Sequence, residues 1–279
     1  MKNKKKCLIY VVAYNHEKFI LKTLQRIPKE IFKKYKTTIL VSDDFSKDKT
    51  SKIAKKYRGK FLKIIYHKKN LGYGGNQKIG YFYAIKNNFD YVVLLHGDGQ
   101  YAPEYIPKIL NNFKDKKNSA VFGSRMIKKG SALKGGMPLY KFFGNKILTY
   151  IQNKILKVSL SEFHSGYRAY RVNVLKNIFF ELNSDDYCFD TDIIIQLVIL
   201  KKKIKEIPIP TFYGDEISYV NGTKYAFQIV VSSLISKLHI FGILKLKKLQ
   251  IINNKKLNKF KKQLQDDLFY KFKKSKKIF

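Results

Sequence analysis

The sequence has no tryptophan, only two cysteines and only five arginines. Cys7 and Cys188 match no metal-binding or redox spacing, which argues against a disulfide framework and favours a reducing compartment. Lysine serves at almost every other basic position. Each arginine therefore indicates a place where the planar, two-pronged guanidinium is needed.

Long apolar runs are also missing. Residues 7–13 follow a basic start but are too short for the apolar core of a secretory signal. No stretch reaches the roughly 18 apolar residues that a membrane-spanning helix needs. The nearest, residues 226–244, is interrupted by Gln228, Lys237 and His239. The sequence thus predicts a cytoplasmic protein that does not cross a membrane.

Acidic residues are scarce: 57 lysines and arginines face 20 aspartates and glutamates, for a formal charge of +37. Such a charge favours polyanionic partners, namely nucleic acid, an anionic membrane face or phosphorylated substrates. A general drift of composition towards lysine explains it equally well. A basic nucleic-acid-binding protein remains an alternative of a different class, but no RNA- or DNA-binding motif supports it. We therefore expect no nucleic-acid partner.

The remaining pattern is typical of an α/β protein. Apolar content of 45% and aromatic content of 15% indicate a globular chain. Apolar strands over residues 7–13, 38–42, 62–67 and 91–95 alternate with helices over 17–34, 46–56 and 77–86. This alternation predicts a mostly parallel central sheet flanked by helices. Polar clusters follow the strands at residues 14–17, 43–44, 70–76 and 96–100, so four loops should meet at one rim of the sheet.

The segment from His96 to Gln100 is the most specific of these loops. Asp98 and Gln100 follow a buried strand and stand between glycines. Together they offer two oxygen ligands to a hard divalent cation, and a diphosphate with water could complete an octahedron. A plain turn into a helix is the structural alternative.

Two other loops allow more than one interpretation. The glycines at 72, 74 and 75 match neither the dinucleotide fingerprint nor the P-loop, so the loop can be a simple strand-to-helix turn. Asp43 and Asp44 can cap the following turn, or accept hydrogen bonds from a ribose or a base.

Six segments in this order resemble the family 2 glycosyltransferases, and within them the dolichyl- and polyprenyl-phosphate sugar synthases. They are residues 11–17, 41–50, 70–75, 96–100, 123–125 and 165–171. The resemblance implies a GT-A (Rossmann-like) fold over residues 1–226. It implies an inverting transfer from a nucleotide sugar, UDP- or GDP-linked, assisted by Mg²⁺ or Mn²⁺.

The resemblance also implies roles for individual residues. Asp98 and Gln100 should hold the metal, and Ser165 and Gly166 should shape the acceptor loop. Arg125, Arg168 and Arg171 should face the diphosphate or an acceptor phosphate. The nucleotide sugar should be bound by Ala13, Tyr14, Asn15, Glu17, Asp43, Asp44, Gly72, Gly74, His96 and Gly97.

His96 is a departure, because the family usually has an aspartate at this position. Either the imidazole shifts the metal preference towards Mn²⁺, or it hydrogen-bonds the nucleotide and leaves the metal to Asp98 and Gln100. We expect the second.

The acceptor decides whether a base is needed. A polyprenyl phosphate is already ionised, whereas a hydroxyl of a growing cell-surface glycan, the alternative acceptor, needs a carboxylate to take its proton. Asp190 and then Asp192 are the candidates for that base, although both can simply complement a helix N-terminus.

From residue 245 onward, apolar residues recur at three- and four-residue steps among lysines. This pattern predicts one or two basic amphipathic helices in a C-terminal extension over residues 227–279. The extension either packs on the domain or binds an anionic membrane surface, which would make the enzyme peripheral to the membrane.

Overall fold

An eight-stranded sheet forms the centre of the molecule, in the order β7-β5-β6-β4-β1-β2-β3-β8. The computed structural model describes residues 4–59, 61–210, 212–213 and 220–278, the last eight by backbone alone. The strands are β1 (Lys6–Ala13), β2 (Lys36–Asp43), β3 (Leu62–His67), β4 (Tyr91–His96), β5 (Asn118–Ser124), β6 (Arg168–Arg171), β7 (Lys203–Pro208) and β8 (Lys276–Ile278). Strands β3, β2, β1 and β4 run parallel, as do β5 and β7, whereas β6 and β8 are antiparallel to their neighbours.

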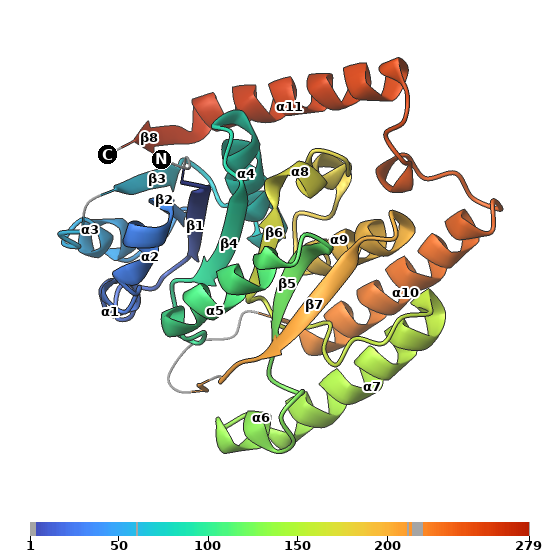
Figure 1. Ribbon diagram of the computed structural model, residues 1–279, viewed down its shortest axis with the longest axis horizontal. Coiled ribbons are helices and arrows are strands. Elements are labelled where there is room, and N and C mark those ends of the chain that lie inside the picture. The colour runs from blue at the N-terminus through green and yellow to red at the C-terminus, as the bar shows by residue number, and fades with distance from the viewer. Residues whose placement is uncertain (1–3, 60, 211, 214–219, 279) are drawn as a thin grey trace.

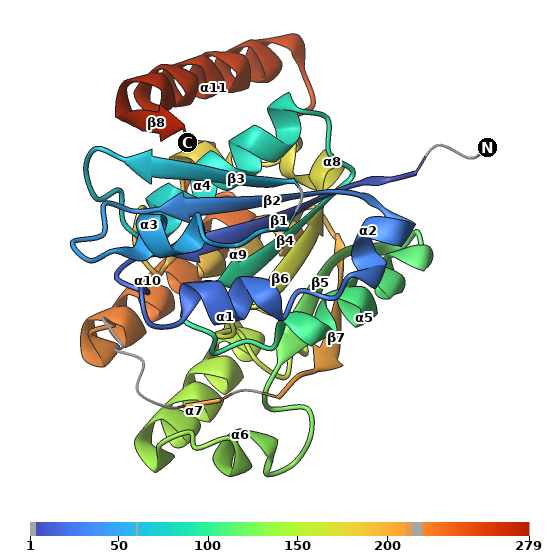
Figure 2. The ribbon, with the colours of Figure 1, turned by 90° about the vertical axis from the view of Figure 1, so that its left-hand side faces the viewer.

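Helices cover both faces of this sheet (Figures 1 and 2). They are α1 (Ile20–Gln25), α2 (Glu30–Lys34), α3 (Thr50–Ala54), α4 (Tyr73–Lys86), α5 (Ile106–Asn111), α6 (Ser131–Lys134), α7 (Leu139–Leu156), α8 (Val172–Leu175), α9 (Phe189–Ile199), α10 (Gly222–Ile240) and α11 (Lys255–Ser275). Short 3₁₀ turns lie at η1 (Pro103–Tyr105), η2 (Asn112–Lys114), η3 (Phe180–Leu182) and η4 (Lys247–Leu249). The mostly parallel sheet expected from the sequence is confirmed.

Strand β1 shows why the central strands are apolar at every position. Leu8, Tyr10 and Val12 enter the core beneath α4 and α9, whereas Ile9 and Val11 enter the core on the opposite face, beneath α1 and α5. Successive side chains point to opposite faces of a sheet, so a strand that is covered on both faces must be apolar throughout.

The helix expected over residues 17–34 is two short helices, α1 and α2. Pro28 lies between them. Proline has no N–H to donate and disfavours helical geometry in the residue before it. The expectation of one continuous helix over residues 17–34 is therefore wrong, because the chain breaks at this proline.

The C-terminal helix α11 packs on the domain. Its buried Lys261 bonds the carbonyl of Ile178 and the carboxylate of Glu181, and Phe269 lies against Phe82 of α4. Leu268 and Phe269 join the core cluster. Of the two alternatives for the tail, the structure supports packing, since side chains in its apolar stripe contact protein.

Helix α10 runs across residue 226, where the sequence suggested that the catalytic domain ends. It packs on α7 and α9. Residues 214–219 lie outside the described residues. Within the described ranges, no helix combines the length and the apolar composition that crossing a membrane requires.

Two helix glycines give a matched test of this packing. A Cβ on Gly80 of α4 would lie 2.3 Å from the Tyr10 ring, whereas a Cβ on Gly144 of α7 would meet nothing within 4 Å. Gly80→Ala should lower the free energy of unfolding by about 2–3 kcal/mol through overpacking. Gly144→Ala should raise it by about 0.5–1 kcal/mol through helix propensity. Urea denaturation of both variants measures this, and equal effects would contradict it.

Candidate functional site

The loops after β1 and β2 are joined into one unit at the rim of the sheet. The Asn15 N–H donates to Ser46 Oγ at 2.9 Å, and the His16 N–H donates to Thr50 Oγ1 at 2.7 Å. The Glu17 N–H is held by Asp48 at 3.0 Å. Ala13, the last residue of β1, pairs with Asp43, and Tyr14 begins the loop. The expected convergence of these loops is therefore present.

Asp43 and Asp44 hold this unit together. Asp43 is fully buried and accepts hydrogen bonds from the Ser46 N–H and the Ser51 hydroxyl, as a turn-capping residue does. Asp44 accepts from the Leu71 N–H at 2.8 Å, which ties the loop after β2 to the glycine-rich loop. Burial raises the pKa of the Asp44 carboxyl from 3.8 to about 7. Contact of either carboxylate with a nucleotide stays a prediction.

The glycine-rich loop makes room for a neighbouring backbone. A Cβ on Gly72, whose φ is +79°, would lie 2.5 Å from the Asp185 carbonyl oxygen, and one on Gly74 would lie 2.4 Å from that of Ser184. The Gly74 N–H donates to the same Asp185 carbonyl at 2.8 Å. Close approach of this segment explains both glycines. Their expected contact with the nucleotide sugar remains a prediction.

A chain of hydrogen bonds joins the end of β4 to the start of α9. The Tyr73 hydroxyl lies 3.1 Å from His96 Nε2 and 3.1 Å from Asp190 Oδ2. An ionised carboxylate only accepts, so the single hydroxyl proton of Tyr73 goes to Asp190 and His96 donates from Nε2. Gln77 donates to the other Asp190 oxygen at 3.1 Å. His96 thus makes an internal hydrogen bond with Nε2 and carries its lone pair on Nδ1.

The expected acceptor loop lies directly against His96. A Cβ on Gly166 would come within 2.6 Å of the imidazole, so only glycine fits. The Gly166 N–H donates to the Tyr101 hydroxyl at 2.9 Å, and the Ser165 carbonyl accepts from Arg168 Nε at 2.8 Å. The structure therefore brings together the segments around residues 96–101 and 165–168, as expected from the sequence.

Two of the three arginines are buried in internal contacts. Arg125 pairs with the buried Glu162 and donates to the Tyr213 hydroxyl and the His164 carbonyl. Arg168, about 1% exposed, donates to the backbone carbonyls of three other residues: Phe163, Ser165 and Asp190. Both guanidiniums hold the backbone of residues 163–165 in place through these hydrogen bonds. Direct contact with a phosphate stays a prediction.

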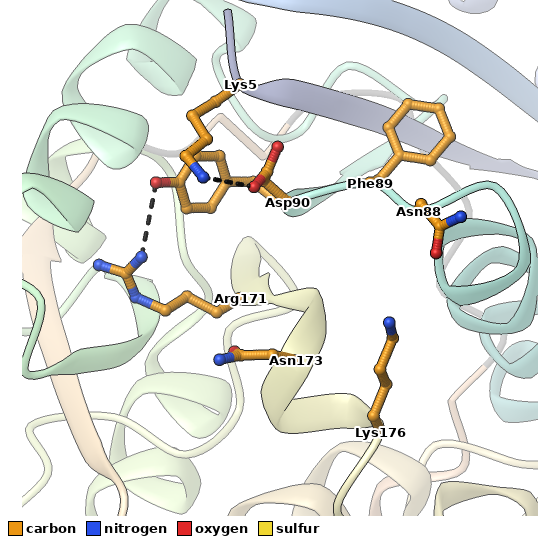
Figure 3. Close-up of a pocket in the computed structure, with 8 residues that line it drawn as sticks. Lys5, Asn88, Phe89, Asp90, Arg171, Asn173 and Lys176 are labelled. Atoms are coloured by element: carbon orange, nitrogen blue, oxygen red, sulfur yellow. Dashed lines mark hydrogen bonds and ion pairs between the residues drawn. The ribbon is translucent and has the colours of Figure 1, made fainter. Parts of the chain in front are cut away.

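Arg171 is not part of the rim. It pairs with Tyr91, the first residue of β4, whereas His96 is the last. It lines a pocket of about 340 Å³ at the opposite end of the strands. Figure 3 shows it there with Lys5 and Asp90. Its guanidinium donates to the carbonyl of Asn118. The expectation that it faces a phosphate fails because β6 runs antiparallel to β4, which places residues 168 and 171 at opposite ends.

Asp192 also lies away from the rim. Its carboxylate pairs with Lys248 at 2.8 Å and accepts from the Ser232 hydroxyl and the Ser184 N–H. It therefore links α9 to α10 and to η4. Asp190, in contrast, lies at the rim, but both of its oxygens are engaged and Arg168 Nε is 3.6 Å away.

Asp98 and Gln100 form a turn at the end of β4. The Gln100 N–H donates to Asp98 Oδ1 at 3.0 Å, and Gly99 has a φ of +78°. Gly97 lies close to His16, because a Cβ there would be 2.9 Å from His16 Nδ1. Burial lowers the pKa of both His16 and His96, so two neutral rings flank the carboxylate.

This donor set suits a hard cation that shares its ligands with a substrate. Among the described residues, no three His, Cys, Asp or Glu side chains form a group able to hold a metal ion alone. The partly exposed Asp98 can supply one oxygen and Gln100 another, and Mg²⁺ commonly takes its remaining ligands from phosphates and water. The residues present therefore fit a metal bound together with a diphosphate.

Sequence reasoning missed several residues that build the rim: Tyr73, Gln77, Tyr101 and Glu162. Glu162 had a usable signal, because it ends a stretch without any acidic residue from 116 to 161 and immediately precedes the segment around Ser165. A lone acid there is the natural partner for one of the few arginines. Tyr73 lies within the rim loop predicted at 70–76 and Tyr101 directly follows the one at 96–100, but no pattern marks these residues or Gln77 as hydrogen-bond partners.

Comparison with known proteins agrees with this geometry. The family model for glycosyl transferase family 2 matches residues 8–179. The UDP-N-acetylglucosamine–dolichyl-phosphate N-acetylglucosaminyltransferase of Methanococcus voltae is 31% identical, over 77% of this chain and 90% of that protein. The undecaprenyl-phosphate mannosyltransferase of Micrococcus luteus is 26% identical, over 75% of this chain and 84% of that protein.

Among solved structures, the fold is similar to glucosyl-3-phosphoglycerate synthase from Mycobacterium tuberculosis in complex with Mn²⁺, UDP and phosphoglyceric acid. The TM-score is 0.60 at 12% identity, over 84% of this chain and 78% of that one. The fold is therefore the GT-A fold of glycosyltransferases. This chain belongs to glycosyltransferase family 2, and it is a hexosyltransferase-type enzyme.

The raised pKa of Asp44 gives a pH-dependent stability. Between about pH 4 and pH 7 the unfolded state has lost this proton and the folded state keeps it, so rising pH destabilises the fold. Asp44→Asn lacks this cost. We expect the variant to gain up to about 2–4 kcal/mol relative to the parent between pH 4 and pH 8. Denaturant melts at several pH values measure the difference, and a constant difference would contradict it.

The Tyr73 hydroxyl is the second target. Tyr73→Phe removes the link between His96 and Asp190 and should lower sugar transfer about 10- to 100-fold, with a stability cost of about 1–2 kcal/mol. Tyr10→Phe is the matched control, since its buried hydroxyl donates to Asn76 in the core beneath α4. It should have a similar stability cost and keep transfer within about twofold. Equal losses of transfer in both variants would refute a specific role for Tyr73.

Proposed function

We propose that this enzyme transfers a sugar, with inversion, from a nucleotide sugar to a polyprenyl phosphate at a membrane face. The observation that carries the proposal is the meeting of the Asp98 turn with the loop around Gly166 at the C-terminal end of β4. In this arrangement the proposed cation site for a diphosphate would lie beside the loop expected to receive the acceptor. The two relatives are named for dolichyl-phosphate and undecaprenyl-phosphate acceptors, which supports a lipid phosphate as the acceptor.

The donor would lie over the carboxyl ends of β1, β2 and β4, the usual ligand position in an open α/β sheet. A divalent cation would be held by Asp98 and Gln100, and it would supply neutralisation of the charge on the leaving nucleoside diphosphate. Mg²⁺ and Mn²⁺ both suit this carboxylate and amide set. The chain's own part is to keep the Asp98 turn in place and to leave His96 neutral beside it.

The state of the two candidate bases favours a phosphate acceptor over a hydroxyl of a growing glycan. Asp190 has both oxygens in hydrogen bonds, and Asp192 is paired with Lys248. Neither is free to remove a proton from a hydroxyl. An ionised phosphate attacks without a base, so engaged carboxylates do not hinder it. We assign Asp190 to positioning Tyr73 and Gln77.

The metal ligand is tested by Asp98→Asn. We expect transfer to fall at least about 100-fold. The thermal shift caused by a UDP- or GDP-sugar together with Mn²⁺ or Mg²⁺ should also disappear, because binding to the folded state is lost. Asp266→Asn on the exposed side of α11 is the matched control and should behave as the parent. An Asp98 variant that transfers at the full rate would refute the site.

The acceptor is tested with a matched pair of lipids, a polyprenyl phosphate and the same polyprenol without its phosphate. We expect labelled sugar to pass only to the phosphate. Anomeric analysis should show a β-linked product from an α-linked donor. Transfer to the alcohol, or to a glycan hydroxyl in place of the phosphate, would favour the alternative acceptor and restore the need for a base.

A further inference from the structure

Helices α7 and α10 bury mainly polar side chains and expose apolar ones, the opposite of an ordinary surface helix. The buried side of α7 carries three polar residues, Asn145, Thr149 and Gln152, with one apolar residue, Leu156, at the end of the helix. Asn145 donates to Glu162 at 2.8 Å, and the Phe163 N–H donates to Thr149 Oγ1 at 3.4 Å. The inner face of α7 is polar because it holds the segment that leads into the acceptor loop.

The opposite side of α7 is apolar and exposed. Positions 139, 143, 147 and 150 follow the spacing of one helix face, and position 140 adjoins it. The exposed fractions lie between 56% and 73% for Leu139, Tyr140, Phe143, Ile147 and Tyr150.

Helix α10 repeats this arrangement. Its buried side carries Ser233 and Ser236 beside the apolar Ile229, and Gln152 of α7 donates to Ser233 Oγ at 3.4 Å. Tyr225, in its first turn, bonds His164 of the acceptor loop at 2.9 Å. The exposed apolar side chains, 37% to 72% exposed, are Phe227, Leu234 and Leu238, followed by Phe241 just after the helix.

We call these exposed apolar side chains of α7, α10 and Phe241 the outer face. Figures 1 and 2 show the two helices side by side at the periphery of the molecule, away from the central strands of the sheet. A soluble protein places the apolar stripe of a helix against its core, so a reversed pair leaves apolar area that a partner must cover.

The charge around the outer face identifies the partner. Neither helix contains an aspartate or glutamate, and the sequence has none from 116 to 161 or from 217 to 265. Lys146 and Lys154 border the outer face on α7. A second copy of the chain docked through the same face would place lysines against lysines. A bilayer with anionic headgroups instead offers apolar depth and negative charge together.

We propose that the outer face is the membrane-binding surface of this enzyme and that it seats the acceptor loop at the surface of an anionic bilayer. It takes the place of the C-terminal tail, whose apolar stripe contacts the domain. This inference rests on the proposed function, because an enzyme that uses a lipid phosphate must reach it at a bilayer. Binding itself can be measured without any transfer reaction.

The first experiment is flotation of the full chain with vesicles of phosphatidylcholine alone and of phosphatidylcholine mixed with phosphatidylglycerol. The parent should float with the anionic vesicles. Phe143→Ser combined with Ile147→Ser should reduce that binding about tenfold or more, since two inserted side chains are lost. Ile251→Ser combined with Tyr270→Ser, exposed apolar positions elsewhere, is the matched control and should bind as the parent. A parent that does not bind, or equal loss in both pairs, would overturn the proposal.

The second experiment separates local charge from the large charge of the whole chain. Lys146→Gln combined with Lys154→Gln removes two charges beside the outer face. Lys256→Gln combined with Lys259→Gln removes two exposed charges from α11. The first pair should weaken vesicle binding about tenfold or more, and the second less than about twofold. Equal weakening would mean attraction by net charge alone and would refute a defined surface.

Two further measurements keep the outcomes distinct. Sedimentation without lipid should show the same monomer for the parent and for the Phe143 and Ile147 double variant. A dimer that this variant dissociates would make the outer face an interface between copies and overturn the proposal. Transfer to a short, water-soluble prenyl phosphate should be unchanged in the double variant. If no variant transfers sugar to any prenyl phosphate while the vesicle results hold, the surface stands and the proposed acceptor falls.

Discussion

One buried guanidinium, that of Arg168, organises the site. It donates to the carbonyls of Phe163, Ser165 and Asp190, so it gathers the acceptor loop and the start of α9 around the end of β6. A buried charge is tolerated only where it is paired and fully hydrogen-bonded, and Arg168 has both the Asp190 carboxylate and its carbonyl partners. Through Asp190 this order reaches Tyr73 and His96, at the end of β4.

Most of the charged side chains at the rim are engaged in hydrogen bonds or ion pairs within the protein. Arg125 is matched by Glu162, and Arg168 by Asp190. Asp43 and Asp44 accept hydrogen bonds from backbone N–H groups and so hold the loops in place. Asp98 differs, because it is partly exposed and lies in a short turn beside neutral histidines. Its partial exposure is why Asp98 is the carboxylate that we propose as the metal ligand.

The acceptor side of the site and the outer face belong to the same two helices. The polar inner faces of α7 and α10 hold Glu162, Phe163 and His164. Their apolar outer faces are exposed. On both helices the side that faces the domain is occupied by residues that hydrogen-bond to a loop. The apolar residues of each helix therefore lie on the side that faces away from the domain. Site construction and surface chemistry are in this way parts of one arrangement.

Much of this protein follows from sequence alone. Apolar strands that alternate with helices specify a mostly parallel sheet, and polar residues after each strand specify one ligand rim, because parallel strands end at the same edge. The place of the Asp98 turn at this rim was predictable for the same reason, whereas its nearness to Gly166 depends on the antiparallel strand β6, which the strand pattern did not predict. Tertiary structure alone decided the partners. It showed that Arg171 faces the far end of the sheet, that Asp192 binds Lys248, and that Tyr73 joins His96 to Asp190. It also showed that the amphipathic tail is packed while α7 and α10 expose their apolar sides. Periodicity reveals that a helix has an apolar side, but which side meets the core depends on what the other side must hold, and that is decided only when distant segments come together.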